Sequence, residues 1–305
     1  MESEIMFLPP GVGEAFAERS GLGFGYITWE HVREMVVPRK LDAYKGTYGH
    51  ALLVCGSKGM SGAATLATGA ALRSGCGLVT VHLPECARFP VEANCPSALF
   101  SLDAGDCFSE LPGDMAKYNA VGVGCGLGRN PRTAAALERL LAWCRTHGIR
   151  MVIDADALNI LSEHPELQAA VPVGSILTPH LGELKRLVGQ WEDEEDKFDR
   201  ANALARRLDC IVVVKGPNSA VCNRGRSIVF NSTGNSGMAK GGSGDVLTGF
   251  LTGLLARGYA PETAAQLGVF LHGAAGDKAA DYYGVEAMNS ADLTEFLAEA
   301  LKETE

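Results

Sequence analysis

The 305-residue sequence lacks the features that would assign it to a membrane, an export route or nucleic acid. No run approaches the roughly 18 consecutive apolar residues that suggest a membrane-spanning helix. Residues 1–14 carry acidic side chains without the basic start of a signal peptide. Acidic residues outnumber basic ones by 36 to 27, so the net charge is −9 and no broad basic surface is expected. We therefore expect no membrane contact and no nucleic-acid partner.

Cysteine pairs at metal-ligand spacing are also missing. The nine cysteines form no Cys-x-x-Cys motif, and their odd number does not fit a complete set of disulfides. We interpret them as reduced thiols of a cytoplasmic protein. Hydrophobic residues make up 47% of the chain and charged residues 21%, so the sequence can bury a large core.

From about residue 48 onward, short apolar runs alternate with helical patterns, which indicates an α/β fold with a mostly parallel sheet. The expected strands are residues 50–55, 78–83, 120–124, 150–153, 175–177 and 210–214. The expected helices are residues 61–74, 131–146, 194–208, 245–256, 261–281 and 290–302. Residues 221–229 suggest an appended hairpin. We expect an N-terminal extension over residues 1–27 and one domain over residues 28–305.

The most informative segment is residues 234–247, where five glycines and two serines lead into an apolar helix. Glycines let successive backbone N–H groups face inward, and the helix adds its positive end, so the segment suits a phosphate. Asp245 would stand at the mouth of this anion hole and accept a proton from an attacking hydroxyl. The alternative is that Asp245 only caps the helix. Gly249 and Gly253 further along are expected to allow close helix packing.

A second motif, Lys215-Gly216-Pro217-Asn218-Ser219, follows an expected strand. Ligands of parallel α/β sheets bind beyond the carboxyl ends of strands, so this turn lies on the functional edge. Lys215 could meet a nucleotide phosphate there. The alternative is a surface lysine that closes a strand.

Two further strand ends carry polar side chains. Asp154 and Asp156 suit Mg²⁺ held through water beside phosphates, although Asp156 could instead cap a helix. His180 opens a helix and lies one turn from Glu183, so both could face the cleft, or His180 could simply cap or pack. The glycine run of residues 122–128 lacks the Gly-x-Gly-x-x-Gly spacing, which argues against a Rossmann dehydrogenase.

These motifs occur in an order that resembles the NAD(P)H-hydrate dehydratase family, a carbohydrate kinase-like domain. The resemblance covers residues 45–301 and is carried by residues 45–50, 56–64, 154–159, 178–183 and 234–245. It implies a ribokinase-like three-layer sandwich whose mostly parallel central sheet is flanked by helices. It also implies a lyase that dehydrates (S)-NADHX and (S)-NADPHX to NADH and NADPH. ADP or ATP would drive the step as co-substrate together with Mg²⁺, and ADP, hydrolysed to AMP and phosphate, is favoured.

The resemblance also assigns roles to residues. Asp245 would be the catalytic acid side chain, with Gly242, Ser243 and Gly244 forming the anion hole. The residues expected to contact the hydrated cofactor are Ala63, Gly126, His180 and Asp245, together with Asn159 and Asn235. The residues expected to bind the adenine nucleotide are Lys215, Gly216, Pro217, Asn218, Ser219 and Gly244. No metal ligands are assigned, and a homotetramer is expected.

Two positions depart from the family pattern. Lys240 stands where a small polar residue is common, and its charge near the phosphates could alter nucleotide preference. Ser219 often is threonine and keeps the hydroxyl. A small-molecule kinase of the same fold, such as a vitamin-precursor kinase, is the main alternative. A nucleotide-sensing binding protein without turnover is a third, although a carboxylate at an anion hole has no clear purpose there.

Overall fold

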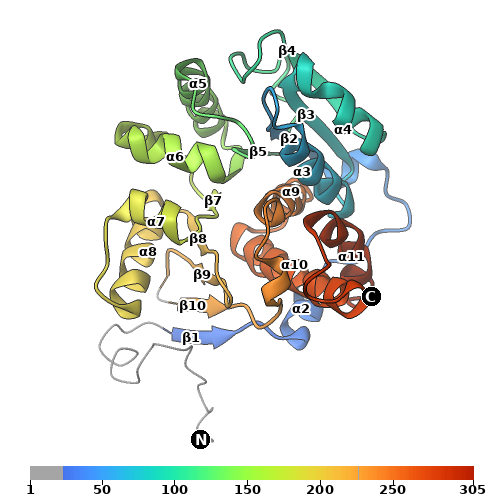
Figure 1. Cartoon of the computed structure of the whole chain (residues 1–305), viewed down its shortest axis with the longest axis vertical. Helices are drawn as coiled ribbons and strands as arrows, with labels where there is room; N and C mark the ends of the chain where they lie inside the picture. The colour runs from blue at the N-terminus through green and yellow to red at the C-terminus, as the bar shows by residue number, and fades with distance from the viewer. Residues whose placement is uncertain (1–22, 226) are drawn as a thin grey trace, which may run out of the picture.

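The computed structural model describes residues 23–225 and 227–305, which build one sheet covered by helices on both faces (Figure 1). Within these residues the sheet has the order β1-β10-β9-β8-β7-β6-β5-β2-β3-β4. The strands are β1 (Gly23–Tyr26), β2 (His50–Val54), β3 (Leu78–Pro84), β4 (Leu99–Asp103), β5 (Ala120–Val123), β6 (Arg150–Ile153), β7 (Ile176–Leu177), β8 (Ile211–Val214), β9 (Ala220–Cys222) and β10 (Ser227–Phe230).

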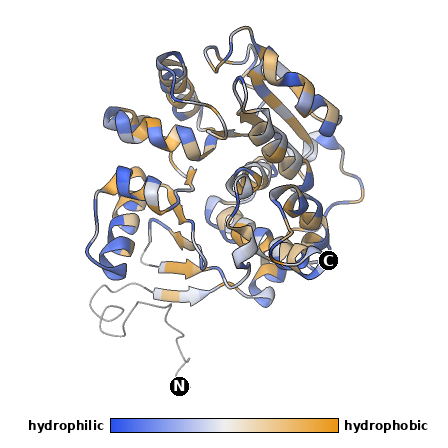
Figure 2. Cartoon of the chain, viewed as in Figure 1, coloured by the Kyte–Doolittle hydropathy of each residue, from blue (hydrophilic) through white to orange (hydrophobic). Residues whose placement is uncertain are grey.

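Two groups of helices pack on the two faces. Helices α5 (Pro131–His147), α6 (Ala155–Glu163), α7 (Leu181–Val188) and α8 (Glu194–Leu208) contribute to one apolar cluster. Helices α2 (Trp29–Met35), α3 (Ser61–Arg73), α4 (Arg88–Asn94), α9 (Ser243–Ala256), α10 (Pro261–Tyr283) and α11 (Ser290–Lys302) contribute to the other. Figure 2 shows helices with apolar sides toward the sheet and polar sides outward. The three-layer sandwich predicted from the sequence is confirmed.

The strands from β4 through β2 to β8 all run parallel to one another, and β9 pairs antiparallel with β8. The predicted hairpin is also confirmed, because β9 and β10 pair antiparallel with Val221 opposite Val229. Strand β4 was not expected from the sequence. It lies at the edge of the sheet, and its exposed Leu99 and Leu102 share the strand with the polar Ser101, so it has no continuous apolar run.

The prediction of an extension up to residue 27 is wrong for its last five residues. Strand β1 pairs in parallel with β10, and Ile27 is buried and donates a backbone hydrogen bond to Phe230. Four residues, two of them glycine, are too few for a periodic signal, so only the pairing partner reveals the strand. The first 22 residues of the predicted extension lie outside the described residues.

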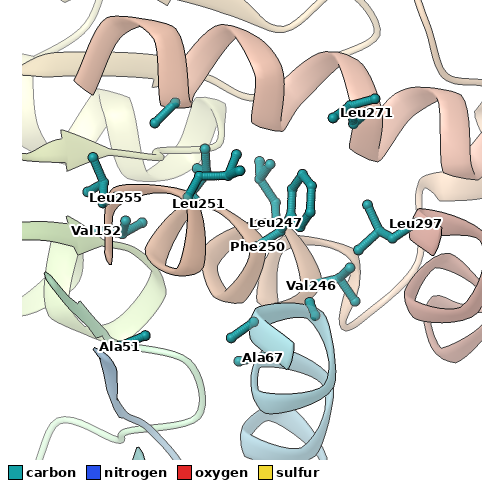
Figure 3. Close-up of a cluster of buried hydrophobic side chains, with 14 of the residues drawn as sticks. Ala51, Ala67, Val152, Val246, Leu247, Phe250, Leu251, Leu255, Leu271 and Leu297 are labelled. Carbon is teal, nitrogen blue, oxygen red and sulfur yellow. The ribbon is translucent and has the colours of Figure 1, made fainter. Parts of the chain in front are cut away.

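Helix α9 runs through the centre of one helical layer. Figure 3 shows Val246, Leu247 and Phe250 of α9 between α3, which carries Ala67, and α10, which carries Leu271. A Cβ on Gly249 would lie 1.9 Å from the Ala67 carbonyl oxygen, and one on Gly253 would lie 1.9 Å from Ser74 Oγ. The predicted role of these glycines in close helix packing is therefore confirmed. The first turn of α9 is consequently held against a rigid core.

Candidate active site

The motifs identified in the sequence meet at one edge of the sheet. Strands β2, β5, β6, β7 and β8 are parallel and adjacent, so their carboxyl ends face the same edge. Ala63 follows β2, Gly126 follows β5, Asp154 follows β6, His180 follows β7 and Lys215 follows β8. The glycine-rich segment also lies at this edge, because Gly244 is next to Lys215, and it leads into α9. The fold thus brings together segments that are far apart in the chain.

The glycine-rich segment turns into α9 two residues earlier than the sequence predicts. Gly242 is the N-cap, with φ at 96°, and a Cβ there would lie 2.5 Å from Leu66 Cδ1. The backbone angle therefore favours glycine strongly, and a larger side chain would also have to displace Leu66. Ser243, Gly244 and Asp245 form the first helical turn, where backbone N–H groups have no partner within the helix. These groups and the helix dipole are suited to hold an anion.

Asp245 does not cap α9, because the N-cap position belongs to Gly242. Burial raises the pKa of the Asp245 carboxyl, and the negative charge of Asp154 adds to this effect. A hydrogen bond from the Cys125 thiol and the positive charge of Lys215 act in the opposite direction without cancelling it. A carboxylate with a raised pKa at the start of an anion-binding helix is equipped to accept a proton from a hydroxyl group.

Lys215 lies inside a charge network. Its ammonium donates a 2.6 Å hydrogen bond to Asp154 Oδ1 and lies 3.9 Å from Glu183 Oε2, while Thr248 Oγ1 donates to Asp154 Oδ2 over 2.7 Å. Its side chain is 19% exposed and that of Asp154 is 2% exposed. Burial disfavours the ammonium, but the two carboxylates nonetheless raise the pKa of Lys215. The lysine is therefore a buried, charged group of the cleft, and not a surface lysine.

The network adjoins the anion-binding turn. A Cβ on Gly244 would lie 3.2 Å from Lys215 Nζ and 3.5 Å from Asp154 Oδ2. A bound phosphate at the first turn of α9 would thus have a fixed positive charge beside it. Thr248 has no signal in the sequence, because it lies within a helix that is apolar nearly all round.

His180 and Glu183 form a reciprocal cap for α7. The N–H groups of Gly182 and Glu183 donate to His180 Nδ1, and the N–H group of His180 donates to Glu183 Oε2 over 2.8 Å. This arrangement leaves the proton of a neutral His180 on Nε2. The imidazole is 55% exposed and can still meet a ligand, whereas Glu183 is buried and burial raises its pKa. The sequence left capping and ligand contact open, and the structure shows the capping.

Asp156 supports a loop and does not cap α6. Its Oδ2 accepts a 2.8 Å hydrogen bond from Gly128 N, which fixes the glycine run after β5. Within that run Gly126 has φ at 60°, and a Cβ on it would lie 2.9 Å from Ala63 Cβ. Gly126 and Ala63 therefore lie side by side, although they follow different strands.

Asn159 and Asn235 are both engaged with other side chains. Asn159 Oδ1 accepts a hydrogen bond from Arg186, between α6 and α7. Asn235 Oδ1 accepts from Gly237 N, and its Nδ2 donates to Asp277 over 3.0 Å. The ammonium of Lys240 is also engaged within the protein, because it donates to the backbone carbonyls of Glu286, at 2.7 Å, and Met288.

The donor set fits Mg²⁺ bound together with nucleotide phosphates, but not a metal held by protein alone. Within the described residues, no cluster of three or more His, Cys, Asp or Glu side chains could hold a metal ion. Asp154 already accepts from Lys215 and Thr248, and Asp156 from Gly128. Mg²⁺ commonly keeps waters and takes only one or two carboxylates beside substrate phosphates, and Asp154 and Asp156 are the carboxylates available for this role.

A cavity of about 250 Å³ opens beside the Lys215 motif. Apolar side chains form much of its wall, and the turn after β8 forms its rim. The residues that line it are Leu181, Glu194, Lys197, Phe198, Val214, Lys215, Gly216, Pro217, Asn218, Ala220 and Phe230. Its place beside Lys215 puts an apolar pocket next to the positive charge, as an adenosine and its phosphates would require.

The parallel sheet, the helix that begins in a glycine-rich turn and the adjacent aspartate define a ribokinase-like α/β protein. A family model described as NAD(P)H-hydrate dehydratase matches residues 51–299. The chain is 31% identical to a Bacillus subtilis ADP/ATP-dependent NAD(P)H-hydrate dehydratase co-crystallized with ATP and Mg²⁺, with a TM-score of 0.80 over 92% of this chain and 99% of that one. The chain belongs to the NAD(P)H-hydrate dehydratase family.

Sequence relatives agree with this assignment. An ADP-dependent (S)-NAD(P)H-hydrate dehydratase of Neisseria meningitidis is 37% identical over 254 residues, which cover 82% of this chain and 83% of the relative. A bifunctional NAD(P)H-hydrate repair enzyme of Moorella thermoacetica is 37% identical over 286 residues, but only 53% of that protein is covered. The chain thus spans about half the length of the bifunctional relatives. A hydroxyethylthiazole kinase of Pyrococcus horikoshii, at 16% identity and a TM-score of 0.58, shares the fold.

Proposed function

We propose that this protein removes water from the hydrated nicotinamide ring of (S)-NADHX and (S)-NADPHX, with ADP converted to AMP and phosphate. The observation that carries the proposal is the placement of Asp245 and the first-turn N–H groups of α9 beside Lys215. Together they supply a proton acceptor, an anion hole and a positive charge. Family membership supports the choice of substrate.

The proposed chemistry has two steps. In the first, the ring hydroxyl attacks the β-phosphorus of ADP, Asp245 takes up the hydroxyl proton, and AMP leaves. In the second, the carbon–oxygen bond breaks, phosphate departs and the ring loses a proton to become the reduced nicotinamide. Hydroxide is a poor leaving group and phosphate a good one, so phosphorylation makes the elimination possible. The N–H groups of Ser243, Gly244 and Asp245 hold the negative charge on the transferred group.

The remaining residues bind and orient the two substrates in this proposal. Lys215, Gly216, Pro217, Asn218, Ser219 and Gly244 hold the nucleotide, and the neighbouring cavity accepts its adenosine. Ala63, Gly126, His180, Asn159 and Asn235 are assigned to the hydrated cofactor. Mg²⁺ bound with the nucleotide would neutralise charge on its phosphates, and Asp154 and Glu183, the carboxylates beside Lys215, would be the protein groups nearest to it.

The test is an assay of the purified chain with hydrated NADH, Mg²⁺ and either ADP or ATP. Recovery of the near-ultraviolet absorbance of reduced nicotinamide, with one AMP and one phosphate formed per NADH when ADP is used, supports the proposal. A stable phosphorylated product would instead identify a kinase, and nucleotide binding without turnover would identify a sensor. The ratio of kcat/KM for ADP and ATP decides the preferred nucleotide, for which we propose ADP.

Two coarser expectations complete the proposal. We propose a homotetramer, which light scattering of the eluted protein would test. We also propose a cytoplasmic location, which fractionation of cells would test. Within the described residues, none of the helices has the length and apolar character needed to cross a membrane.

A further inference from the structure

Helix α10 lies directly behind the glycine-rich segment and contacts both of its ends. At the start of the segment, Gly234 N donates to Asp277 Oδ2 over 2.8 Å and Asn235 Nδ2 donates to Asp277 Oδ1 over 3.0 Å. At its end, His272 Nε2 lies 3.0 Å from the carbonyl oxygen of Ser243, the first residue of α9. Two side chains of one helix therefore hold the two ends of the segment.

Thr233, which immediately precedes the segment, and the side chain of Met238 within it pack closely against α10. A Cβ on Gly273 would lie 2.3 Å from Thr233 Oγ1, and one on Gly276 would lie 2.2 Å from Met238 Sδ. Larger side chains at either position would push the segment away from the helix. The segment is thus shaped by a helical surface that carries small residues between His272 and Asp277.

The hydrogen-bond donors and acceptors of His272 and Asp277 match those of the groups they contact. A carbonyl oxygen only accepts, so His272 must donate from Nε2. Burial lowers the pKa of His272 to about 4, which keeps the imidazole neutral with a single N–H on that nitrogen. Asp277 faces two donors, Gly234 N and Asn235 Nδ2, and each of its two side-chain oxygens accepts one hydrogen bond. Each contact therefore depends on the particular side chain present.

We propose that His272 and Asp277 are positioning residues, which hold the glycine-rich segment in its phosphate-accepting shape without touching either substrate. His272 fixes the carbonyl of Ser243 and so aims the N–H groups of the first turn of α9 into the cleft. Asp277 fixes the point where the segment leaves β10. A preformed anion hole needs no rearrangement when charge develops on the phosphoryl group, so these contacts act on the chemical step. This inference rests on the proposed function.

The first experiment is a double-mutant cycle on Asp277 and Asn235. Asp277→Asn places an amide opposite the amide of Asn235, whereas the double variant Asn235→Asp/Asp277→Asn reverses the pair and restores every hydrogen bond. We expect each single variant to lower kcat roughly tenfold or more, with KM for ADP changed less than about threefold, because the loss lies in transition-state stabilisation. The double variant should recover the part of the loss that comes from the broken Asp277–Asn235 pair, so that the combined effect is clearly smaller than the sum of the two single effects. If Asn235 also contacts substrate, the loss of that contact lowers kcat equally whether residue 277 is Asp or Asn. It therefore cancels when the coupling between the two positions is calculated.

The second experiment compares two replacements of His272. His272→Gln keeps a side-chain N–H for the Ser243 carbonyl, and His272→Leu removes it while keeping an apolar fill. We expect the glutamine variant to retain kcat within about threefold and the leucine variant to lose roughly tenfold or more. The control on the same helix is Lys278→Ala, which removes an ion pair with Glu303 on the far side from the segment and should leave kcat unchanged.

Amide hydrogen exchange separates this inference from the proposed function. Asp277→Asn should accelerate exchange in residues 234–245 and leave the rest of α10 protected, whether or not the protein dehydrates hydrated NADH. If the wild-type protein lacks dehydratase activity while the variant shows this local change in exchange, the proposed function alone is overturned. Unchanged exchange in the variant, or additive effects of the two single variants on kcat, would overturn the inference.

Discussion

Asp245 combines a raised pKa with a position at the anion-binding turn of α9. We predict that Asp245→Asn lowers kcat by roughly two to four orders of magnitude while nucleotide binding persists, because the amide cannot accept the hydroxyl proton. The acid limb of the wild-type kcat profile should lie above the ordinary aspartate pKa of 3.8. Activity requires the ionised form, so a raised pKa moves the loss of activity to higher pH. Steady-state rates from pH 5 to 8 and calorimetric titration with ADP test both statements.

Lys215 compensates a carboxylate that is almost completely buried. We predict that Lys215→Met lowers the free energy of unfolding by about 3–5 kcal/mol, since Asp154 is left as an uncompensated buried charge. Adding Asp154→Asn should restore much of the loss, because the neutral amide can still accept from Thr248. Urea unfolding of the wild type, both single variants and the double variant measures the coupling. An equal midpoint for wild type and Lys215→Met would show that the pair contributes no stability.

At the scale of single elements, helix α9 carries both the core and the site. Its apolar sides pack against α3 and α10 (Figure 3). Its first turn carries N–H groups without partners in the helix. Any change in how α9 docks against α3 would therefore displace the anion hole. The two glycines on the α3 side allow the helices to approach to backbone contact.

We predict that Gly249→Ala lowers the free energy of unfolding by roughly 3 kcal/mol or more and also lowers kcat. The added methyl group would overlap the Ala67 carbonyl, which is backbone and cannot swing away. The matched control is Gly62→Ala in α3, where a Cβ meets nothing within 4 Å. Alanine there should stabilise the protein by about 0.5–1 kcal/mol through helix propensity. Thermal and urea unfolding of the two variants should thus move in opposite directions.

For the whole molecule, buried neutral histidines set how stability responds to acid. In the unfolded chain the His272 pKa returns to its ordinary 6.5, whereas in the folded protein burial lowers it to about 4. Between these values the unfolded chain binds the proton and the folded protein does not, so stability falls as pH falls. Burial also lowers the pKa values of His50 and His82 and adds in the same direction.

We predict that the urea midpoint decreases steadily from pH 7 to pH 5, in a range above the ordinary titration of most carboxyl groups. Asp245 and Glu183, whose pKa values are raised by burial, act oppositely because the folded protein takes up their protons first. His272→Gln should show a shallower slope, since glutamine does not titrate. A slope equal to the wild-type slope would mean that His272 contributes nothing to the acid response.

The local patterns were enough to predict the α/β class, the hairpin, six strands and the family to which the chain belongs. They were also enough to single out Asp245 and Lys215. Both motifs, glycines before an apolar helix and a lysine at a strand end, can be recognised from a few consecutive residues. The pKa of Asp245 was beyond reach, because Asp154 and Cys125 act on it across space from other strand ends.

Short stretches of sequence therefore determined the layers, the glycine-rich turn before α9 and the side chains capable of chemistry. The tertiary structure alone decided which of those side chains meet. It pairs Lys215 with Asp154 across 61 positions of the chain, ties Lys240 to the backbone carbonyls of Glu286 and Met288, and joins Asp277 to Asn235, 42 residues earlier. Hydrogen bonds and charges act over a few ångströms in space, and only packing brings such distant positions together.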